Sequence, residues 1–207
     1  MVEIKSMSNN KPILGPCDSY QLAPFQYEFA WDMYKECRKN EWSPAEIGVG
    51  EDVADWKSAD LPDSHRHLFL SVMAQLTVFD VERGDDAAES FLRIMQPAEL
   101  TMFMKRLVFE EAGHVESYRY CIENMGIPEW GPDNIYDIWK KVPEFKNRID
   151  FSQSISDPLL DWSHKKISSA DYSLEDKEAF FRAAFYWFLV FEGVMFWASL
   201  LLSLIHI

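Results

Sequence analysis

The apolar positions of this chain recur every three or four residues, which is the period of an α-helix. The clearest run follows Pro97 and lies on one helix face: Leu100, Phe103, Met104, Leu107, Val108, Val115, Tyr118, Cys121, Ile122 and Met125. Pro97 suits the start of this helix and Gly126 suits its end. We find no convincing alternation with the period of two that a half-buried β-strand requires. The pattern therefore predicts an all-α fold, a bundle of long helices.

Glycine and proline residues divide the rest of the chain into further predicted elements. We expect an extended N-terminal arm over residues 1–24, a helix over residues 25–39 and an irregular segment over residues 42–59. The next helix is expected to begin near Asp60 and Pro62 and to reach about Glu82, with a continuation past Gly84 left open. A loop region with a short helix follows Gly126, more helix is expected around residues 152–167, and Ser173 can cap a last helix. Residues 25–207 then form one bundle domain.

Four polar residues interrupt the apolar faces of these predicted helices: Asp80, Glu111, His114 and Glu192. Glu111 and His114 follow Leu107 by four and seven residues, so they share its buried face. The aspartate follows Leu76 by four residues, so it too points inward. The glutamate of the last helix is surrounded by aromatic and aliphatic residues. Three predicted helices therefore bring carboxylates and an imidazole toward the interior.

The cost of burying these groups favours a bound cation. A lone buried carboxylate costs several kcal/mol unless it is protonated, paired or bound to a metal ion. Each residue alone has an ordinary interpretation as a core carboxylate or core histidine, and a single Glu-x-x-His is common by chance. The four together, with few inward lysines or arginines, favour a metal site. Oxygen ligands with imidazole suit iron or manganese better than structural zinc.

Composition and charge exclude some classes of function. The chain has 207 residues, enough for one large domain, and a net charge of -14, which argues against direct nucleic-acid binding. Three widely spaced cysteines and an N-terminus with no apolar signal core favour the cytoplasm. Residues 183–207 are apolar enough to raise the alternative of a membrane helix. Glu192 near its middle and the lack of basic residues on its C-terminal side argue for a buried bundle helix and no membrane.

Four stretches of the sequence resemble one known family. Residues 67–80 (HLFLSVMAQLTVFD), 111–118 (EAGHVESY) and 191–197 (FEGVMFW) resemble three ligand helices of the small, radical-generating subunit of class I ribonucleotide reductase. Residues 41–46 (EWSPAE) resemble the Trp-x-Pro-x-Glu segment near the start of that family's domain. The resemblance extends from about Phe25 to the end, and two of the ligand helices are highly specific. It implies a ferritin-like helical bundle.

The resemblance also implies roles for particular residues. Asp80, Glu111, His114 and Glu192 would be ligands of two iron ions, or of manganese, or of a mixed manganese and iron pair. Tyr118 would store a radical, Trp42 would lie on the electron-transfer route, and Phe196 would help to form the apolar pocket around the radical. The implied activity is ribonucleoside-diphosphate reductase. The implied partners are the large subunit and a second copy of the chain.

The sequence departs from the family's pattern at its end. The family has a second Glu-x-x-His roughly thirty residues beyond the position of Glu192, and a C-terminal tail that docks on the large subunit, whereas this sequence stops at Ile207. His206 is no substitute, because it lies about 21 Å further along the same predicted helix at 1.5 Å per residue. We therefore expect a bundle that is incomplete at its C-terminus. We also expect that this chain alone does not sustain turnover.

Two alternatives remain open from the sequence. One is a ligand-binding oxidase on the same scaffold, in which Glu replaces the first ligand aspartate, Val follows it two residues later and Phe replaces the radical tyrosine. Asp80, Glu82 and Tyr118 favour the reductase instead. The other alternative is a ferritin-like metal-storage or purely structural bundle. The remaining histidines, His65, His67, His164 and His206, show no partner at ligand spacing and are interpreted as surface or core residues.

Overall fold

The computed structural model describes residues 13–14, 22–81, 85–129, 134–166 and 172–196, and all regular elements in these ranges are helical. In chain order they are α1 (Glu28–Lys39), the 3-10 helix η1 (Pro44–Glu46), α2 (Gly50–Lys57), α3 (Asp63–Phe79), α4 (Asp85–Ile94), α5 (Ala98–Met125), the 3-10 helix η3 (Ile135–Lys141), α6 (Pro143–Lys166), α7 (Leu174–Phe185) and the π-helix η4 (Tyr186–Phe196). The all-α prediction is confirmed for the described residues.

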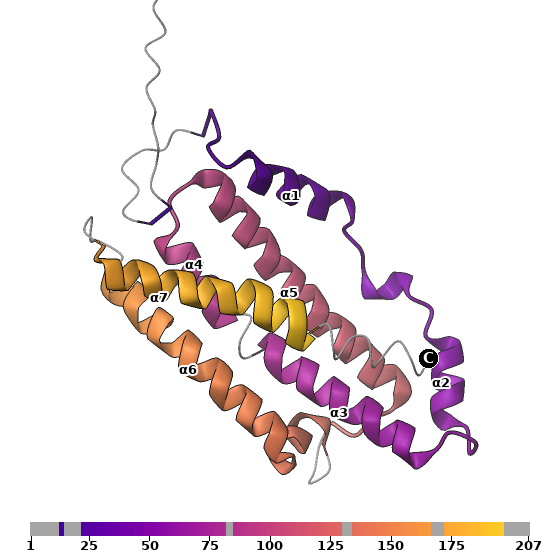
Figure 1. Cartoon of the computed structure of the whole chain (residues 1–207). Helices are drawn as coiled ribbons and strands as arrows, with labels where there is room; N and C mark the ends of the chain where they lie inside the picture. The colour runs from indigo at the N-terminus through magenta and orange to yellow at the C-terminus, as the bar shows by residue number, and fades with distance from the viewer. Residues whose placement is uncertain (1–12, 15–21, 82–84, 130–133, 167–171, 197–207) are drawn as a thin grey trace, which may run out of the picture.

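Helix α5 runs through the length of the bundle, with α1 along one side and α6 and α7 on the other (Figure 1). Its ends follow from the sequence as predicted. Pro97 precedes the first turn in an extended conformation, and Gly126 adopts a left-handed conformation with φ 70° that ends the helix. The amide of Ile127 then donates to the carbonyl of Ile122 at 3.1 Å, which satisfies a carbonyl at the helix terminus.

The core consists of two clusters of apolar side chains that meet at Tyr118. The larger cluster packs α3, α4, α6, α7 and η4 together around buried residues such as Leu76, Phe91 and Phe191. The smaller cluster joins α3 to the end of α5 and to η3, around Met73 and Ile122. Tyr118 is partly buried and packs against both clusters. The tyrosine that the sequence singles out therefore lies inside the bundle.

The prediction of an irregular segment over residues 42–59 is wrong in part. Ser43 caps η1 with a reciprocal bond to Glu46, and α2 follows from Gly50 to Lys57. A glycine at the first position of a helix does not break it, and acidic residues in the first turn of α2 interact favourably with the helix dipole. Val53 and Trp56 of α2 pack against the smaller cluster. Tertiary packing therefore stabilises a helix that proline and glycine signals had obscured.

The structure adds three further details about the helices that the sequence did not predict. Helix α6 begins at Pro143, well before residue 152, because proline is well tolerated in the first turn of a helix. The segment after Gly84 is a separate helix, α4. The last helix is capped by Ser173 as predicted, through a capping box with Asp176, but it changes from α to π geometry at Tyr186.

The N-terminal arm lies mostly outside the described residues. Within it, Leu14 is buried in the larger cluster and pairs with Met95, and the carbonyl of Ile13 accepts from the Gln96 amide at 2.8 Å. The division into an arm and a bundle domain stays a prediction. Among the described residues no helix combines the length and apolarity that a bilayer crossing requires.

Candidate metal centre

Three elements bring the predicted site residues together. Glu111 and His114 lie one turn apart on α5, and Asp80 is the C-cap residue that directly follows α3. Glu192 comes from η4. The backbone around Asp80 and around Glu192 is in π geometry, which is rare and occurs often at functional sites. In a π turn, residues five apart share a face, and such a turn redirects a side chain relative to a regular α-helix.

The closest group consists of Asp80, Glu111 and His114. One ligand atom from each of them lies within 4.8 Å of the others. The Nδ1 atom of His114 is 3.4 Å from Glu111 Oε2 and 3.6 Å from Asp80 Oδ2. Glu192 lies outside this closest group, although its charge contributes to raising the pKa values of Asp80 and His114. The arrangement is a converging set of carboxylate oxygens and one imidazole nitrogen.

Burial makes this group costly in the absence of a cation. The side chain of Asp80 is 1% exposed, that of Glu111 15% and that of His114 36%. Asp80 Oδ2 is buried and receives no hydrogen bond. Within the described part of the chain, no lysine or arginine forms an ion pair with Asp80, Glu111 or Glu192. A carboxylate oxygen left without a donor in the interior costs free energy, so these residues fit a divalent cation.

The pKa values of the site residues also indicate that this group is costly to bury. Burial, followed by the charge of Glu111, raises the pKa of Asp80 to about 8. Burial and the charge of Glu111 also raise the pKa of Glu192 to about 7. A hydrogen bond with Glu111, together with the nearby carboxylates, raises the pKa of His114 in spite of its burial. Clustered groups with shifted pKa values are typical of functional sites.

Tyr118 lies one turn beyond His114, and its hydroxyl faces the Asp80 carboxylate. A hydrogen bond between the two groups favours ionised Asp80, and burial raises the pKa of Tyr118 far above its ordinary value. Tyr118 also borders a cavity of about 540 Å³ whose other lining residues are Thr77, Val78, Val81, Val115, Arg119, Ile122, Tyr136 and Trp139. The phenol therefore stays protonated, with an acidic neighbour on one side and largely apolar surroundings on the other.

Trp42 lies at the other end of the site. Its side chain is 42% exposed and lines a cavity of about 650 Å³ between α1, α5 and η4. Glu111, His114 and Glu192 line the same cavity. The structure thus places Trp42 and three of the four predicted ligands around one space. Phe196 belongs to η4, but its side chain lies outside the described residues, as does His206.

The cavity includes residues that the sequence did not single out. Trp187 is buried, lines the cavity and stacks on Phe191 with 4.5 Å between ring centroids. It precedes Glu192 by five residues, so the π spacing of η4 places both on one side. A search for period 3.6 alone misses this relation. Cys37, the last cysteine before Trp42, also lines the cavity.

Comparison with known proteins places this geometry in a family. Residues 19–204 match the family model described as the ribonucleotide reductase small chain. Over 98% of its length the chain is 22% identical to the ribonucleoside-diphosphate reductase subunit beta of Chlamydia pneumoniae, of which it covers 57%. It is 31% identical over 51% of its length to the ribonucleoside-diphosphate reductase small chain of Trypanosoma brucei brucei, of which it covers 31%. The chain thus spans about half the length, or less, of the curated relatives it matches.

The fold agrees with a solved relative. The ribonucleotide reductase R2 subunit from Clostridium botulinum superposes with a TM-score of 0.58, at 22% identity, over 85% of this chain and 56% of that protein. This likeness confirms the predicted ferritin-like bundle. The family match covers most of the chain, including every predicted site residue. The chain belongs to the ribonucleotide reductase small chain family.

Proposed function

We propose that this chain carries the metal-binding and radical-forming core of a ribonucleoside-diphosphate reductase small subunit. In this proposal Asp80, Glu111, His114 and Glu192 hold iron or manganese, and Tyr118 stores the radical. The observation that carries the proposal is the convergence of Asp80, Glu111 and His114 within 4.8 Å, with one buried aspartate oxygen that receives no hydrogen bond. A purely structural cluster would be expected to satisfy that oxygen with a donor from the protein.

The chain's own residues bind and orient the metal ions. Asp80 is fixed by burial at the end of α3, and Glu111 and His114 approach it from α5. The raised pKa values of Asp80 and Glu192 mean that protons leave these carboxylates when a cation enters. A pair of iron or manganese ions held by these residues would supply the oxidising power, with molecular oxygen as the oxidant, for one-electron oxidation of a nearby tyrosine.

Tyr118 then loses one electron and one proton together. Its raised pKa keeps the phenol protonated at neutral pH, so electron loss must be accompanied by breakage of the O–H bond. The Asp80 carboxylate faces the hydroxyl and would accept the proton. Apolar residues around the ring limit the access of water and of reductants that would quench the radical.

Trp42 connects the proposed site to the surface. It is partly exposed and borders the cavity that Glu111 and His114 also line, so it is suited to pass an electron between a docked partner and the site. We propose the reductase large subunit as that partner, a homodimer as the functional assembly and the cytoplasm as its location. The substrate would be a ribonucleoside diphosphate bound by the large subunit.

A radical test addresses the central claim. The 207-residue chain, loaded anaerobically with Fe(II) and then exposed to air, should show the sharp absorption and the electron paramagnetic resonance signal of a tyrosyl radical. Tyr118→Phe should abolish the signal and leave metal binding intact. Tyr120→Phe is the matched control, because Tyr120 lies on the same helix and donates to the Ile47 carbonyl at the surface. Tyr120→Phe should keep the signal, and a signal that survives in Tyr118→Phe would contradict the assignment.

One observation favours the ligand-binding oxidase as a second candidate. The 650 Å³ cavity reaches Glu111, His114 and Glu192 and is lined largely by apolar side chains, as a site for an apolar small molecule would be. Asp80 and Tyr118 favour the reductase at the positions that distinguish the two. Organic extraction of the purified chain followed by mass spectrometry separates them, since a stoichiometric apolar ligand is expected for the oxidase alone.

A further inference from the structure

A buried arginine on α5 joins the segment that carries Trp42 to the helix that carries the proposed ligands. The side chain of Arg106 is 8% exposed. Its guanidinium contacts Glu110 Oε1 at 2.7–2.8 Å and Glu41 Oε2 at 3.2 Å. It also donates to the Cys37 carbonyl at 3.4 Å, near the end of α1, and lies over the ring of Phe109 at 4.6 Å. One cation therefore contacts two chain segments that are far apart in sequence.

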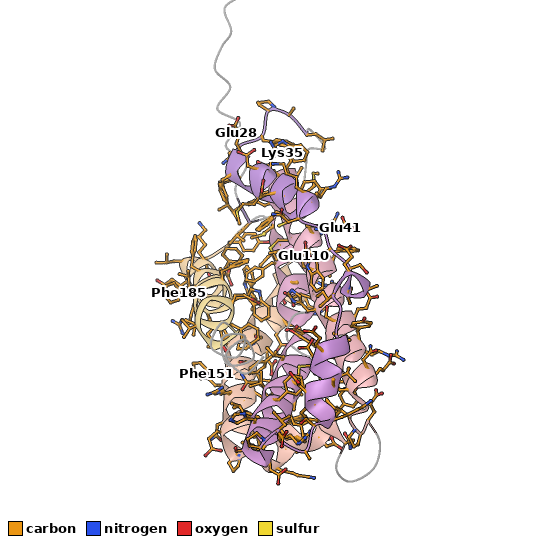
Figure 2. The ribbon with its side chains drawn as sticks, turned by 90° about the vertical axis from the view of Figure 1, so that its right-hand side faces the viewer. Glu28, Lys35, Glu41, Glu110, Phe151 and Phe185 are labelled. Carbon is orange, nitrogen blue, oxygen red and sulfur yellow. The ribbon has the colours of Figure 1, made fainter. Side chains whose placement is uncertain are left out.

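The two carboxylates that Arg106 contacts are each next in sequence to a residue of the proposed site. Glu41 immediately precedes Trp42, and Glu110 immediately precedes Glu111. Figure 2 shows Glu41 and Glu110 next to each other where the chain leaves α1 and passes over α5. Trp42, Glu110 and Glu111 line the same cavity. A fixed distance between the two carboxylates therefore constrains the distance between the tryptophan and the proposed ligand.

A second contact anchors the other end of α1. The buried side chain of Glu99 accepts hydrogen bonds from the amides of Gln26 and Tyr27, both at 2.8 Å. Helix α1 is thus held on α5 by a carboxylate at its start and by Arg106 at its end. Trp31 lies in the first half of α1, nearer the Glu99 contact, so the two anchors can be examined separately.

We propose that Arg106 is a positioning residue that holds Trp42 at the rim of the metal cavity through its ion pairs with Glu41 and Glu110. The proposal rests on the proposed function for the role of Trp42, but the positioning itself is a property of the metal-free chain. Arginine suits the task because its planar fork can bind two carboxylates and a carbonyl at once, whereas lysine presents a single charged point.

The experiment follows Trp42 by fluorine NMR. The full chain is labelled with 5-fluorotryptophan, and its eight tryptophans are distinguished by single Trp→Phe variants, including Trp42→Phe. In Arg106→Gln and in Glu41→Gln the Trp42 resonance should shift and narrow toward that of an exposed, mobile indole, while Trp31 stays in place. Arg106→Lys should give an intermediate shift. Arg119→Gln is the matched control, since Arg119 pairs with Glu123 on the same helix but is 71% exposed and does not contact α1 in any described interaction.

A second measurement connects the position of Trp42 to the cavity. Mn²⁺ added to the wild-type chain should broaden the Trp42 resonance by paramagnetic relaxation, which falls with the sixth power of distance. This broadening should decrease several-fold in Arg106→Gln and stay unchanged in Arg119→Gln. If Mn²⁺ broadens no tryptophan resonance, metal binding at the site is contradicted, yet the metal-free spectra still decide whether Arg106 positions Trp42.

The outcomes are distinguishable from a general loss of structure. Glu41→Gln removes one arm of the contact and keeps the pair between Arg106 and Glu110, so it provides a test if Arg106→Gln fails to fold. A merely structural role would move the Trp31 and Trp42 resonances together. An unchanged Trp42 resonance in both Arg106→Gln and Glu41→Gln would overturn the proposal.

Discussion

Two clusters of charged side chains lie side by side on α5, and they are balanced in opposite ways. Around Arg106, two carboxylates share a guanidinium that the protein itself supplies. Around Asp80, the carboxylates of Asp80 and Glu111 converge with only a histidine, His114, beside them. One buried oxygen of Asp80 receives no hydrogen bond. Because Glu110 and Glu111 are adjacent in sequence, the same turn of helix contributes to both clusters.

The difference favours a structural role for the Arg106 cluster and supports the proposed cation at the Asp80 cluster. A buried ion pair that is complete in the protein stabilises the fold only modestly, but removal of one partner is costly. A cluster of like charges destabilises the fold and persists only when it is neutralised by protons or by a cation. We therefore expect removal of a charge to harm the Arg106 cluster and to relieve the Asp80 cluster.

The largest expected effect is on metal affinity. Asp80→Asn removes the most buried proposed ligand, so Mn²⁺ affinity should fall by at least about a hundredfold, the upper range for loss of an outer-shell partner. Titration calorimetry at pH 8 measures this. Glu116→Gln is the matched control, because Glu116 is exposed on the same helix. Equal affinities in Asp80→Asn and wild type would contradict the ligand assignment.

The next effect concerns the Arg106 cluster. Arg106→Gln should lower the free energy of unfolding by about 2 kcal/mol, less than for a fully buried pair because Glu41 is half exposed. Denaturant unfolding of the metal-free chain measures this loss. The exposed pair of Arg119 with Glu123 provides the comparison, and Arg119→Gln should change the free energy of unfolding far less than Arg106→Gln does. Similar losses in the two variants would mean that Arg106 is no better buried in solution than Arg119.

The pH dependence of metal binding follows from the raised pKa values. At pH 6 Asp80 and Glu192, with pKa values of about 8 and about 7, hold protons that the cation must displace. Mn²⁺ affinity should therefore rise with pH up to about pH 8, by up to about tenfold per unit for each proton displaced. Calorimetry in buffers of different ionisation enthalpy counts the protons released. An affinity independent of pH from 6 to 8 would show that these carboxylates are already ionised.

The smallest effect has the opposite sign to an ordinary core mutation. The raised pKa of Asp80 means that its ionised form destabilises the metal-free fold. This cost develops as the pH rises from the ordinary value of 3.8 to about 8, and it stays constant at higher pH. Asp80→Asn should therefore raise the free energy of unfolding at pH 9 by about 1 kcal/mol and change it little at pH 5. Urea unfolding at the two pH values with chelator present checks this. A loss of stability at pH 9 would mean that the Asp80 charge is compensated by the protein.

Helical phase alone was enough to select most of the candidate site. Glu111 and His114 follow Leu107 on a regular α-helix, so a period of 3.6 residues correctly predicts that they share a face, which in the structure borders the cavity. The ends of α5 at Pro97 and Gly126 and the start of α7 at Ser173 also follow from local capping chemistry. These features depend on neighbours within a few residues, which a sequence displays directly.

Other features depend on contacts between segments distant in sequence. Helix α2 is stabilised by packing against the smaller cluster. Its glycine and the preceding proline indicated an irregular segment, because local signals do not show such packing. The π geometry of η4, which places Trp187 and Glu192 on one side, is invisible to a search for α-helical phase. Arg106 has an ordinary position in a helical pattern, and its burial and its contacts with Cys37 and with Glu41, 65 residues away, distinguish it from the exposed arginines.

The sequence by itself determined the helical fold class, the buried face of α5 and the residue types of the proposed metal site, because these follow from periodicity, capping and the cost of burying charge. The tertiary structure alone decided the distances. It placed Asp80 within reach of Glu111 and His114, left Glu192 outside the closest group, and placed Trp42 on the cavity that Glu111 and His114 line. Those relations depend on how helices pack, and packing is the sum of many weak contacts that no single stretch of sequence contains.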